Sequence, residues 1–278
     1  MLSYRHSFHA GNLADVLKHS ILTAVFDAAT AKVAPLVYID THAGAGIYRL
    51  DEPADSHAEH RAGITALRAL QTHEGPRCIA RYLECVDSVN GAAPTVWYPG
   101  SAMIAARLLR DTDRLILAER HPADWAELDD LLRADHRVTV ECGDGYSLLK
   151  SALPPIERRG IILVDPAYEL ADEPSHLIDG LRHAIKRFRH GVFLIWYPLH
   201  GKHDPATLKR HFRRLDPPKT LCIELDPRQP AQPGATGSGL LIVNPPYQAI
   251  EQLEALRVFL GRTLVPGGRS ACDWLIAE

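Results

Sequence analysis

Short apolar segments rich in strand-forming residues alternate along most of this chain with longer segments whose apolar residues recur at helical spacing. The expected strands, seven in number, cover residues 36–40, 114–119, 137–141, 160–165, 191–196, 220–225 and 239–243. Some of them are almost continuously apolar, as is typical of parallel strands that are buried on both faces. The alternation therefore predicts an α/β fold with a doubly wound, mostly parallel, seven-stranded Rossmann-like sheet, whose ligands bind beyond the carboxyl ends of the strands.

The helical segments have recognisable starting points. Asn12 precedes an apolar pattern over residues 13–28 and is expected to be its N-cap, while Asp15 favours the first turn of that helix. Further helices are predicted at residues 102–109, 123–133, 147–153, 175–188 and 250–260. Residues 47–96 break this rhythm, because they are polar, lack a strong strand pattern and suggest helices near 63–70 and 79–87. We interpret 47–96 as a helical insertion in one domain that spans residues 1–278.

Composition excludes several classes of protein. The hydrophobic content of 46% over 278 residues suits a globular domain with a sizeable core. No segment approaches the roughly 18 uninterrupted apolar residues of a membrane span, and the first residues do not resemble a signal peptide, so we expect a cytoplasmic protein without membrane contact. The five cysteines form no C-x-x-C pair and the histidines show no ligand spacing, so no metal is expected.

The net charge of −3 gives the chain no overall attraction for nucleic acid. Nucleic-acid binding would therefore need local patches. Residues 182–190 and 202–214 hold most of the clustered cations in the C-terminal half. Each stretch is equally well explained as the solvated face of a helix.

Three polar clusters stand at the ends of predicted strands. Residues 40–46 form a turn of small residues, whose backbone can approach a ligand closely, although an ordinary strand-to-helix turn would look the same. Glu119 ends the next strand, where an acid can accept hydrogen bonds from both hydroxyls of a ribose; it could instead pair with Arg120 or cap the following helix. Asp144 and Gly145 follow a third strand, where they could contact an adenine or simply form an Asp-Gly turn.

The sharpest motif is Asp165-Pro166-Ala167-Tyr168, directly after a buried strand. The exocyclic amine of adenine is a weak nucleophile, because its lone pair is delocalised into the ring. A site that methylates this amine needs two hydrogen-bond acceptors for the amino hydrogens and a surface that holds the ring. The Asp165 carboxylate and the Pro166 carbonyl can be the acceptors, and Tyr168 can stack on an extruded base.

A second motif, Asn244-Pro245-Pro246-Tyr247, matches the amino-methyltransferase pattern more closely in its letters. Asn244, however, follows the last predicted strand, too far along the fold to face a ligand held by residues 42–46 and Glu119. We therefore expect Asp165, and not Asn244, to be the catalytic residue.

Over nearly its whole length, the chain resembles the bacterial 23S ribosomal RNA adenine-N6-methyltransferases that carry a helical subdomain inserted into an S-adenosylmethionine (SAM) binding fold. The most specific part of this resemblance is the opening, residues 2–12 and 14–19. It continues through segments 40–46, 98–101, 144–145, 165–166, 196–198 and 244–246. The chain departs from the family at Ala167, where a proline is usual; we expect the chemistry to survive with a looser turn.

The resemblance implies roles for individual residues. Those implied to contact SAM or shape its pocket are Lys18, His19, His42, Gly44, Ser101, Glu119, Asp144, Gly145 and Asp165, and the implied catalytic residues are Asp165, Pro166 and Tyr168. Tyr4, Arg5 and His6 are expected to grip the RNA, although a flexible tail is the alternative. His19 alone would be interpreted as a core histidine.

The resulting hypothesis is a monomeric, cytoplasmic enzyme that uses SAM to methylate the N6 amino group of one adenine in 23S ribosomal RNA, before the ribosome is fully assembled. The alternatives are a DNA adenine-N6-methyltransferase, a catalytically weak RNA-binding protein with a SAM fold, and a small-molecule N-methyltransferase.

Overall fold

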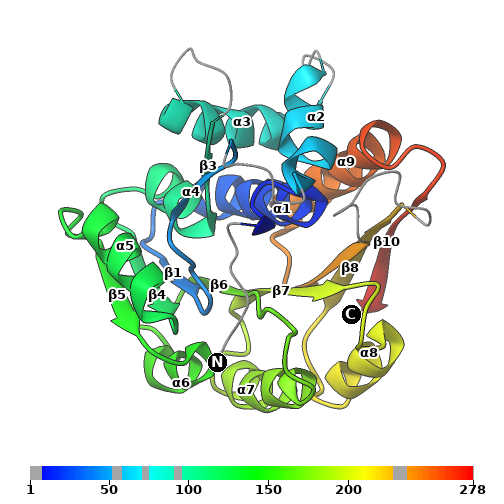
Figure 1. Cartoon of the computed structure of the whole chain (residues 1–278). Coiled ribbons are helices and arrows are strands. Elements are labelled where there is room, and N and C mark those ends of the chain that lie inside the picture. The colour runs from blue at the N-terminus through cyan, green and yellow to red at the C-terminus, as the bar shows by residue number, and fades with distance from the viewer. Residues whose placement is uncertain (1–7, 52–57, 71–74, 91–95, 228–236, 278) are drawn as a thin grey trace.

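The computed structural model describes residues 8–51, 58–70, 75–90, 96–227 and 237–277, and within them an eight-stranded sheet lies between two layers of helices (Figure 1). The strand order is β10-β8-β9-β7-β6-β1-β4-β5. The bounds of these strands are β1 (Val37–Asp40), β4 (Arg114–Glu119), β5 (Val138–Cys142), β6 (Gly160–Val164), β7 (Val192–Pro198), β8 (Thr220–Asp226), β9 (Ser238–Val243) and β10 (Arg269–Ile276).

Five neighbouring strands, β5, β4, β1, β6 and β7, are parallel, and β9, β8 and β10 extend the sheet in antiparallel pairings. The α/β fold and the mostly parallel sheet are thus confirmed, but the predicted number of seven strands is wrong. The strand that the prediction lacks is β10, which lies at the edge of the sheet and has no fully buried residue. An edge strand of this kind has no continuous apolar run to mark it in the sequence.

The helices form two layers on the sheet. One layer consists of α1 (Leu13–Thr30), α4 (Ser101–Leu108), α5 (Pro122–Leu132) and α9 (Tyr247–Thr263), with α2 (Ile64–Ala69) and α3 (Arg77–Asn90) outside it. The other consists of α6 (Gly145–Ala152), α7 (Glu173–Arg187) and α8 (Pro205–Arg213). The predicted helices are all present with small shifts at their ends, and α8 is an addition to them.

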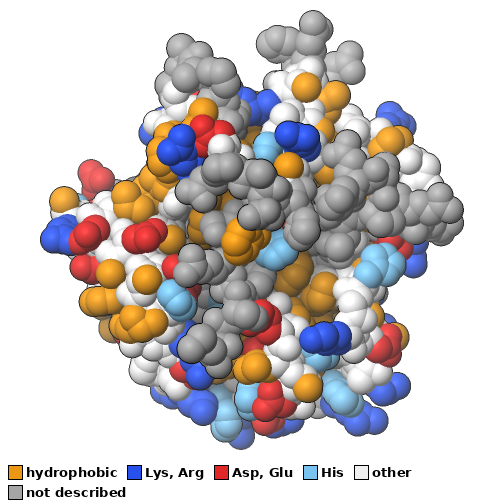
Figure 2. Space-filling view, viewed as in Figure 1, with side chains coloured by type: hydrophobic (Ala, Val, Ile, Leu, Met, Phe, Trp, Pro, Cys, Tyr) orange, Lys and Arg blue, Asp and Glu red, His pale blue; other side chains and the backbone are white. Residues whose placement is uncertain are grey.

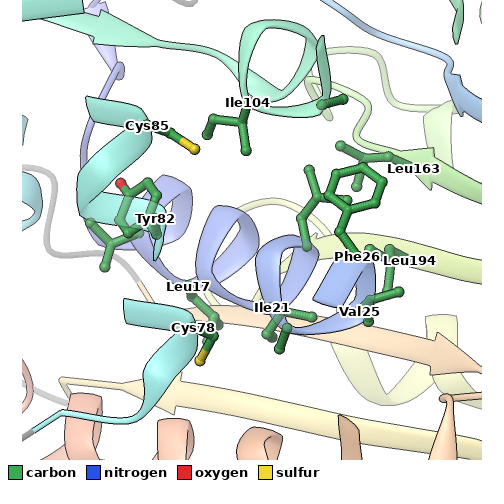
Figure 3. Packing of buried hydrophobic residues seen from close by; sticks show 14 of the residues in the cluster. Leu17, Ile21, Val25, Phe26, Cys78, Tyr82, Cys85, Ile104, Leu163 and Leu194 are labelled. Carbon is green, nitrogen blue, oxygen red and sulfur yellow. The ribbon is translucent and has the colours of Figure 1, made fainter. Parts of the chain in front are cut away.

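Helix α1 is buried on nearly every side, because it lies between the sheet and helix α3. Figure 3 shows Leu17, Ile21 and Val25 of α1 packed among side chains from the sheet and from helices α3 and α4, with Tyr82 of α3 above. As predicted, Asn12 caps the helix by accepting a hydrogen bond from the backbone N–H of Asp15 at 3.0 Å. Polar residues on this helix are therefore held in fixed positions inside the protein.

The segment predicted to be an insertion is connected to the rest of the chain at one place, a short two-stranded ribbon. Strand β2 (Ile47–Arg49) pairs with β3 (Trp97–Pro99) in a two-stranded antiparallel ribbon, and the N–H of Gly100 donates to the carbonyl of Gly46 at 2.7 Å. Between these strands lie the 3-10 helix η2 (Glu59–Ala62), α2 and α3. The expectation of no strand pattern in this segment missed β2, which is only three residues long. Whether 47–96 is a separate subdomain stays a prediction.

The order of the parallel strands reverses at β1, which has β4 on one side and β6 on the other. In doubly wound sheets this switch point creates a crevice beyond the carboxyl ends of the strands. Asp40, Glu119 and Val164 are the last residues of β1, β4 and β6. The motifs of the sequence analysis are consequently brought to the same edge of the sheet.

Candidate active site

A cavity of about 560 Å³ opens at this edge, within the range of roughly 300–1,000 Å³ that is usual for cofactor sites. Figure 2 shows the molecule hollowed near the centre of the same face. All the described residues that were predicted to bind the cofactor or to act in catalysis line this cavity: Lys18, His19, His42, Gly44, Ser101, Glu119, Asp144, Gly145, Asp165, Pro166 and Tyr168. The structure thus brings them together, while their individual roles stay predictions.

Asp40, at the end of β1, is a fully buried carboxylate that holds residues of the cavity wall in place. It accepts hydrogen bonds from the Tyr38 hydroxyl and the Ser101 hydroxyl, both at 2.7 Å, and from the backbone N–H of His42 at 3.2 Å. Burial raises the pKa of Asp40, and these three hydrogen bonds act against that rise. Asp40 therefore fixes both Ser101 and the turn after β1. The sequence reading included it in the turn but gave it no role of its own.

Glu119 connects two loops at the mouth of the cavity. One carboxylate oxygen accepts from the N–H of Gly44 at 2.8 Å and the other from the N–H of His121 at 2.7 Å. A carboxylate has about four acceptor positions, so each oxygen retains one for a ligand. Among the described residues, neither an ion pair with Arg120 nor a cap on α5 is found for Glu119.

The Asp144-Gly145 pair begins helix α6. Asp144 caps the helix by accepting from the N–H of Ser147 at 2.9 Å, so it has a structural role here, while its contact with an adenine stays a prediction. A Cβ atom on Gly145 would lie 2.0 Å from the carbonyl oxygen of Thr41, which is closer than atoms can approach. Glycine at 145 is therefore required for the start of α6 to pack against the turn after β1.

Asp165 is held by a buried lysine from the opposite side of the cavity. Lys18 of α1 donates to Asp165 Oδ2 and pairs with Asp15 Oδ1 at 2.8 Å. Burial alone would lower the pKa of Lys18, but the two carboxylates outweigh it and raise the pKa above its ordinary value. Lys18 is thus a permanent cation, and Asp165 Oδ1 has no partner among the described residues. Asp15, which was predicted only as a favourable first-turn residue, is part of this site.

Tyr168 follows Asp165 in a strained turn. Its φ is +54°, a conformation that is uncommon outside glycine and that recurs at functional sites. Its hydroxyl donates to the carbonyl of Trp196 at 3.0 Å, and its ring meets the Trp196 ring edge-on, with centroids 5.6 Å apart. The indole N–H of Trp196 is itself bonded to Ser238 at 2.8 Å. The two rings therefore form a fixed aromatic wall on the β7 side of the cavity.

The helical segment also reaches the cavity. Tyr82 of α3 is bonded to the hydroxyl of Tyr98 at 2.8 Å, and Tyr98 in turn to Nδ1 of His19 at 2.6 Å. Glu59 of η2 accepts from His9 at 2.9 Å and from Asn12 at 3.0 Å. The sequence reading missed these contacts, since Glu59 and Tyr82 lie in a segment without a recognisable motif.

Asn244 lies at the other end of the sheet. Strand β9 runs antiparallel to β7, and Val243 pairs with Phe193 near the start of β7. The side-chain amide of Asn244 donates to the carbonyls of Arg189 and Gly191 at 2.8 and 2.9 Å. Asn244 is thus not among the residues that line the cavity, as its place after the last predicted strand led us to expect; that it takes no part in catalysis stays a prediction.

The predicted RNA contacts Tyr4, Arg5 and His6 lie outside the described residues. Of the two basic stretches, residues 182–190 contribute to the end of α7 and residues 202–214 to α8. On the face shown in Figure 2, Lys, Arg and His side chains lie over this region, with Asp and Glu among them. Within the described part of the chain, no helix is long and apolar enough to span a membrane, and no group of His, Cys, Asp and Glu side chains could hold a metal ion.

Comparisons with known proteins agree with this geometry. A family model described as "Ribosomal RNA large subunit methyltransferase D, RlmJ" matches residues 33–276. The chain is 39% identical to a protein of Haemophilus influenzae and 38% identical to one of Escherichia coli, each named "Ribosomal RNA large subunit methyltransferase J", with both chains covered completely in each case. A crystal structure of a Legionella pneumophila protein superposes with a TM-score of 0.88 at 33% identity, covering 96% of this chain and 98% of that one.

Proposed function

The chain belongs to the RlmJ family of ribosomal RNA large-subunit methyltransferases. From this premise we propose that it methylates the N6 amino group of one adenine in 23S ribosomal RNA. The methyl donor is S-adenosylmethionine. The observation that carries the proposal is the position of Asp165, which shares one cavity with Glu119 and is held there by Lys18.

The cavity fits the donor chemically. Glu119 retains an acceptor position on each oxygen, which suits the two hydroxyls of a ribose. Gly44 and Gly145 bring backbone close to the same space, and Ser101 is oriented there by Asp40. When bound, S-adenosylmethionine supplies an electrophilic methyl group on a sulfonium sulfur.

Asp165 and Pro166 hold the amine of the substrate. The free oxygen Oδ1 of Asp165 can accept one amino hydrogen, and the carbonyl of Pro166 can accept the other. Both hydrogen bonds withdraw the nitrogen lone pair from the ring and turn it toward the methyl group. Lys18 fixes the orientation of the Asp165 carboxylate through their ion pair, so Lys18 is a positioning residue in this proposal.

Tyr168 and Trp196 bound the space that the target base enters. The Tyr168 ring is only 7% exposed and is immobilised by its hydrogen bond to the Trp196 carbonyl. The part of the ring that faces the cavity is a preformed surface for an extruded adenine. Ala167 lies between Pro166 and Tyr168 and lines the cavity without adding a polar group.

Tyr4, Arg5 and His6 remain the proposed contacts to the RNA. Action before the ribosome is fully assembled, a monomeric state and a cytoplasmic location also stay predictions. An overall charge of −3 supports a substrate that is recognised locally, at a structured segment of RNA.

Transfer of a tritiated methyl group tests the function directly. We expect transcribed 23S ribosomal RNA to be labelled on adenine N6, and duplex DNA and free adenosine to remain unlabelled. Asp165→Ala should abolish the transfer, and circular dichroism would show that the variant is folded. Labelling of DNA or free adenosine, or unchanged labelling by Asp165→Ala, would contradict the proposal.

A further inference from the structure

A second cavity, which we call the flanking pocket, lies on the other side of Tyr168. It has a volume of about 270 Å³ and is formed where β7 ends and helices α7 and α8 begin. Tyr168 lines both this cavity and the larger one. The polar side chains of the flanking pocket that matter here are Lys202, His203, Asp204, Thr207 and His211.

Hydrogen-bond donors dominate this set. Lys202 carries a full positive charge, and His203 and His211 each offer an imidazole N–H even when they are neutral. Asp204 supplies the one carboxylate of the pocket lining, but its oxygens already accept from the N–H groups of Ala206 and Thr207 at 3.1 and 2.9 Å. The polar part of the lining therefore offers mainly hydrogen-bond donors, which suits an anionic group.

The donors are not used by the protein itself. Within the described residues, no ion pair or side-chain hydrogen bond involves Lys202, His203 or His211. The Nε2 atom of His203 is buried and has no hydrogen-bond partner there. A buried polar atom without a partner costs stability, and such atoms recur where a ligand completes the hydrogen bonding.

His203 also links the flanking pocket to the active-site turn. Its ring lies against the ring of Tyr168, with centroids 5.8 Å apart and an angle of 52° between the planes. A group bound at His203 would thus be one aromatic ring away from the base held in the larger cavity.

We infer that the flanking pocket binds a backbone phosphate of the RNA, at a linkage next to the target adenine. This inference rests on the proposed function, because a base that enters the larger cavity brings its own sugar and phosphates with it. The net charge of the chain is −3, so the phosphates need local donors, and the flanking pocket supplies them beside Tyr168. The flanking pocket would then fix the position of the RNA strand along the protein, without selecting which base is methylated.

The first test compares variants with matched charge changes. Lys202→Gln removes one positive charge from the flanking pocket, and His211→Gln replaces its imidazole with a neutral amide. Arg213→Gln is the control, because it removes one exposed cation at the end of α8 that does not line the pocket. We expect each pocket variant to raise KM for RNA about five- to tenfold, and the salt dependence of binding to become shallower. Values of kcat at saturating RNA and the affinity for S-adenosylhomocysteine should stay within about twofold of the wild type. Equal KM values for the pocket variants and Arg213→Gln would overturn the inference.

The second test changes the RNA. A short RNA around the mapped target adenine is made with a neutral methylphosphonate at the linkage on its 5′ or its 3′ side. We expect one of the two RNAs to be a poorer substrate for the wild type, and to cause little further loss for the Lys202→Gln/His211→Gln double variant, because groups in contact are not additive. If both proteins lose the same factor, the phosphate contact lies elsewhere and the inference fails. If the wild type methylates no RNA at all, the proposed function itself fails.

Discussion

Lys18, in the second turn of helix α1, donates a hydrogen bond to the carboxylate of Asp165, which directly follows strand β6. The two residues are far apart in the sequence, and their contact joins the N-terminal helix to the turn after β6, which we propose to be catalytic. Because Lys18 also pairs with Asp15, one buried cation serves two carboxylates. This shared cation makes the orientation of the Asp165 carboxylate a property of the fold.

Replacing Asp165 should remove chemistry without removing the fold. Asp165→Asn keeps the shape of the side chain but loses its charge and its ion pair with Lys18. We expect methyl transfer to fall about 10²- to 10⁴-fold, a range typical of positioned catalytic groups. Single-turnover labelling measures the loss, and circular dichroism checks the fold. Activity within a few-fold of the wild type would show that Asp165 does not hold the amine.

Replacing Lys18 should impair both stability and rate. Lys18→Met leaves two carboxylates near one another without their cation, and breaking a buried ion pair costs about 3–5 kcal/mol. Urea denaturation measures the free energy of unfolding. The double variant Lys18→Met/Asp15→Asn removes one of the stranded charges and should regain part of the stability, but not the activity. A Lys18→Met protein as stable as the wild type would refute this account of the pair.

Two glycines near the cavity should respond differently to alanine. A Cβ at Gly145 would clash with the Thr41 carbonyl at 2.0 Å, whereas one at Gly143 would meet nothing within 4 Å. We expect Gly145→Ala to lose about 1–3 kcal/mol of stability, as overpacking does, together with affinity for S-adenosylhomocysteine. Gly143→Ala is the matched control and should bind normally. Similar calorimetric titrations of the two variants would count against the required close approach at 145.

The hydrogen-bonded hydroxyls of Tyr82 and Tyr98, which connect α3 to His19, should matter for binding of the methyl donor. Tyr98→Phe removes the hydrogen bond between Tyr98 and Nδ1 of His19, and the loss of one hydrogen bond costs about 0.5–1.5 kcal/mol. Tyr82→Phe lies one step further away and keeps the bond between Tyr98 and His19, so it should weaken donor binding less. Calorimetry on both variants gives the order. A larger effect at Tyr82 than at Tyr98 would exclude a relay to His19.

The contact between His9 and Glu59 should make stability depend on pH. Its hydrogen bond to Glu59 raises the pKa of His9 above 6.5, although burial opposes the rise. A raised histidine pKa contributes stability that is fully present below the unfolded pKa of about 6.5 and is lost as the pH rises through the folded value. The wild type should thus exceed His9→Gln in stability at pH 6, and the gap should narrow by pH 9. In a Glu59→Gln background, the difference in stability between the protein with His9 and the His9→Gln variant should be small at every pH. A difference that does not change with pH in the wild-type background would contradict the prediction.

The periodicity of apolar residues predicted the helices and the central strands, but not the edge strand β10 or the short strand β2. The strands β1, β4 and β6 were found because they are buried on both faces and continuously apolar. Strand β10 was missed because it lies at an edge, and β2 because three residues are too few to show an alternation. These two failures share one cause: short or half-exposed strands leave no pattern in the sequence.

The candidate site was predictable where a residue follows a strand directly, as Glu119 and Asp165 do. The supporting residues were not, since Asp15, Glu59 and Tyr82 act through contacts between segments that are distant in sequence. The antiparallel direction of β9 likewise decided the position of Asn244, and direction is a property of the whole sheet.

The hydrogen bond between Gly100 and Gly46 closes the chain behind η2, α2 and α3. This hydrogen bond places the turn after β1 directly beside the start of α4, although η2, α2 and α3 lie between them in the sequence. The start of α4, and with it Ser101, is therefore positioned by the backbone contact of Gly100 and not by the length of the segment before it. The contact of Tyr82 with Tyr98 in turn couples this segment to His19 at the cavity.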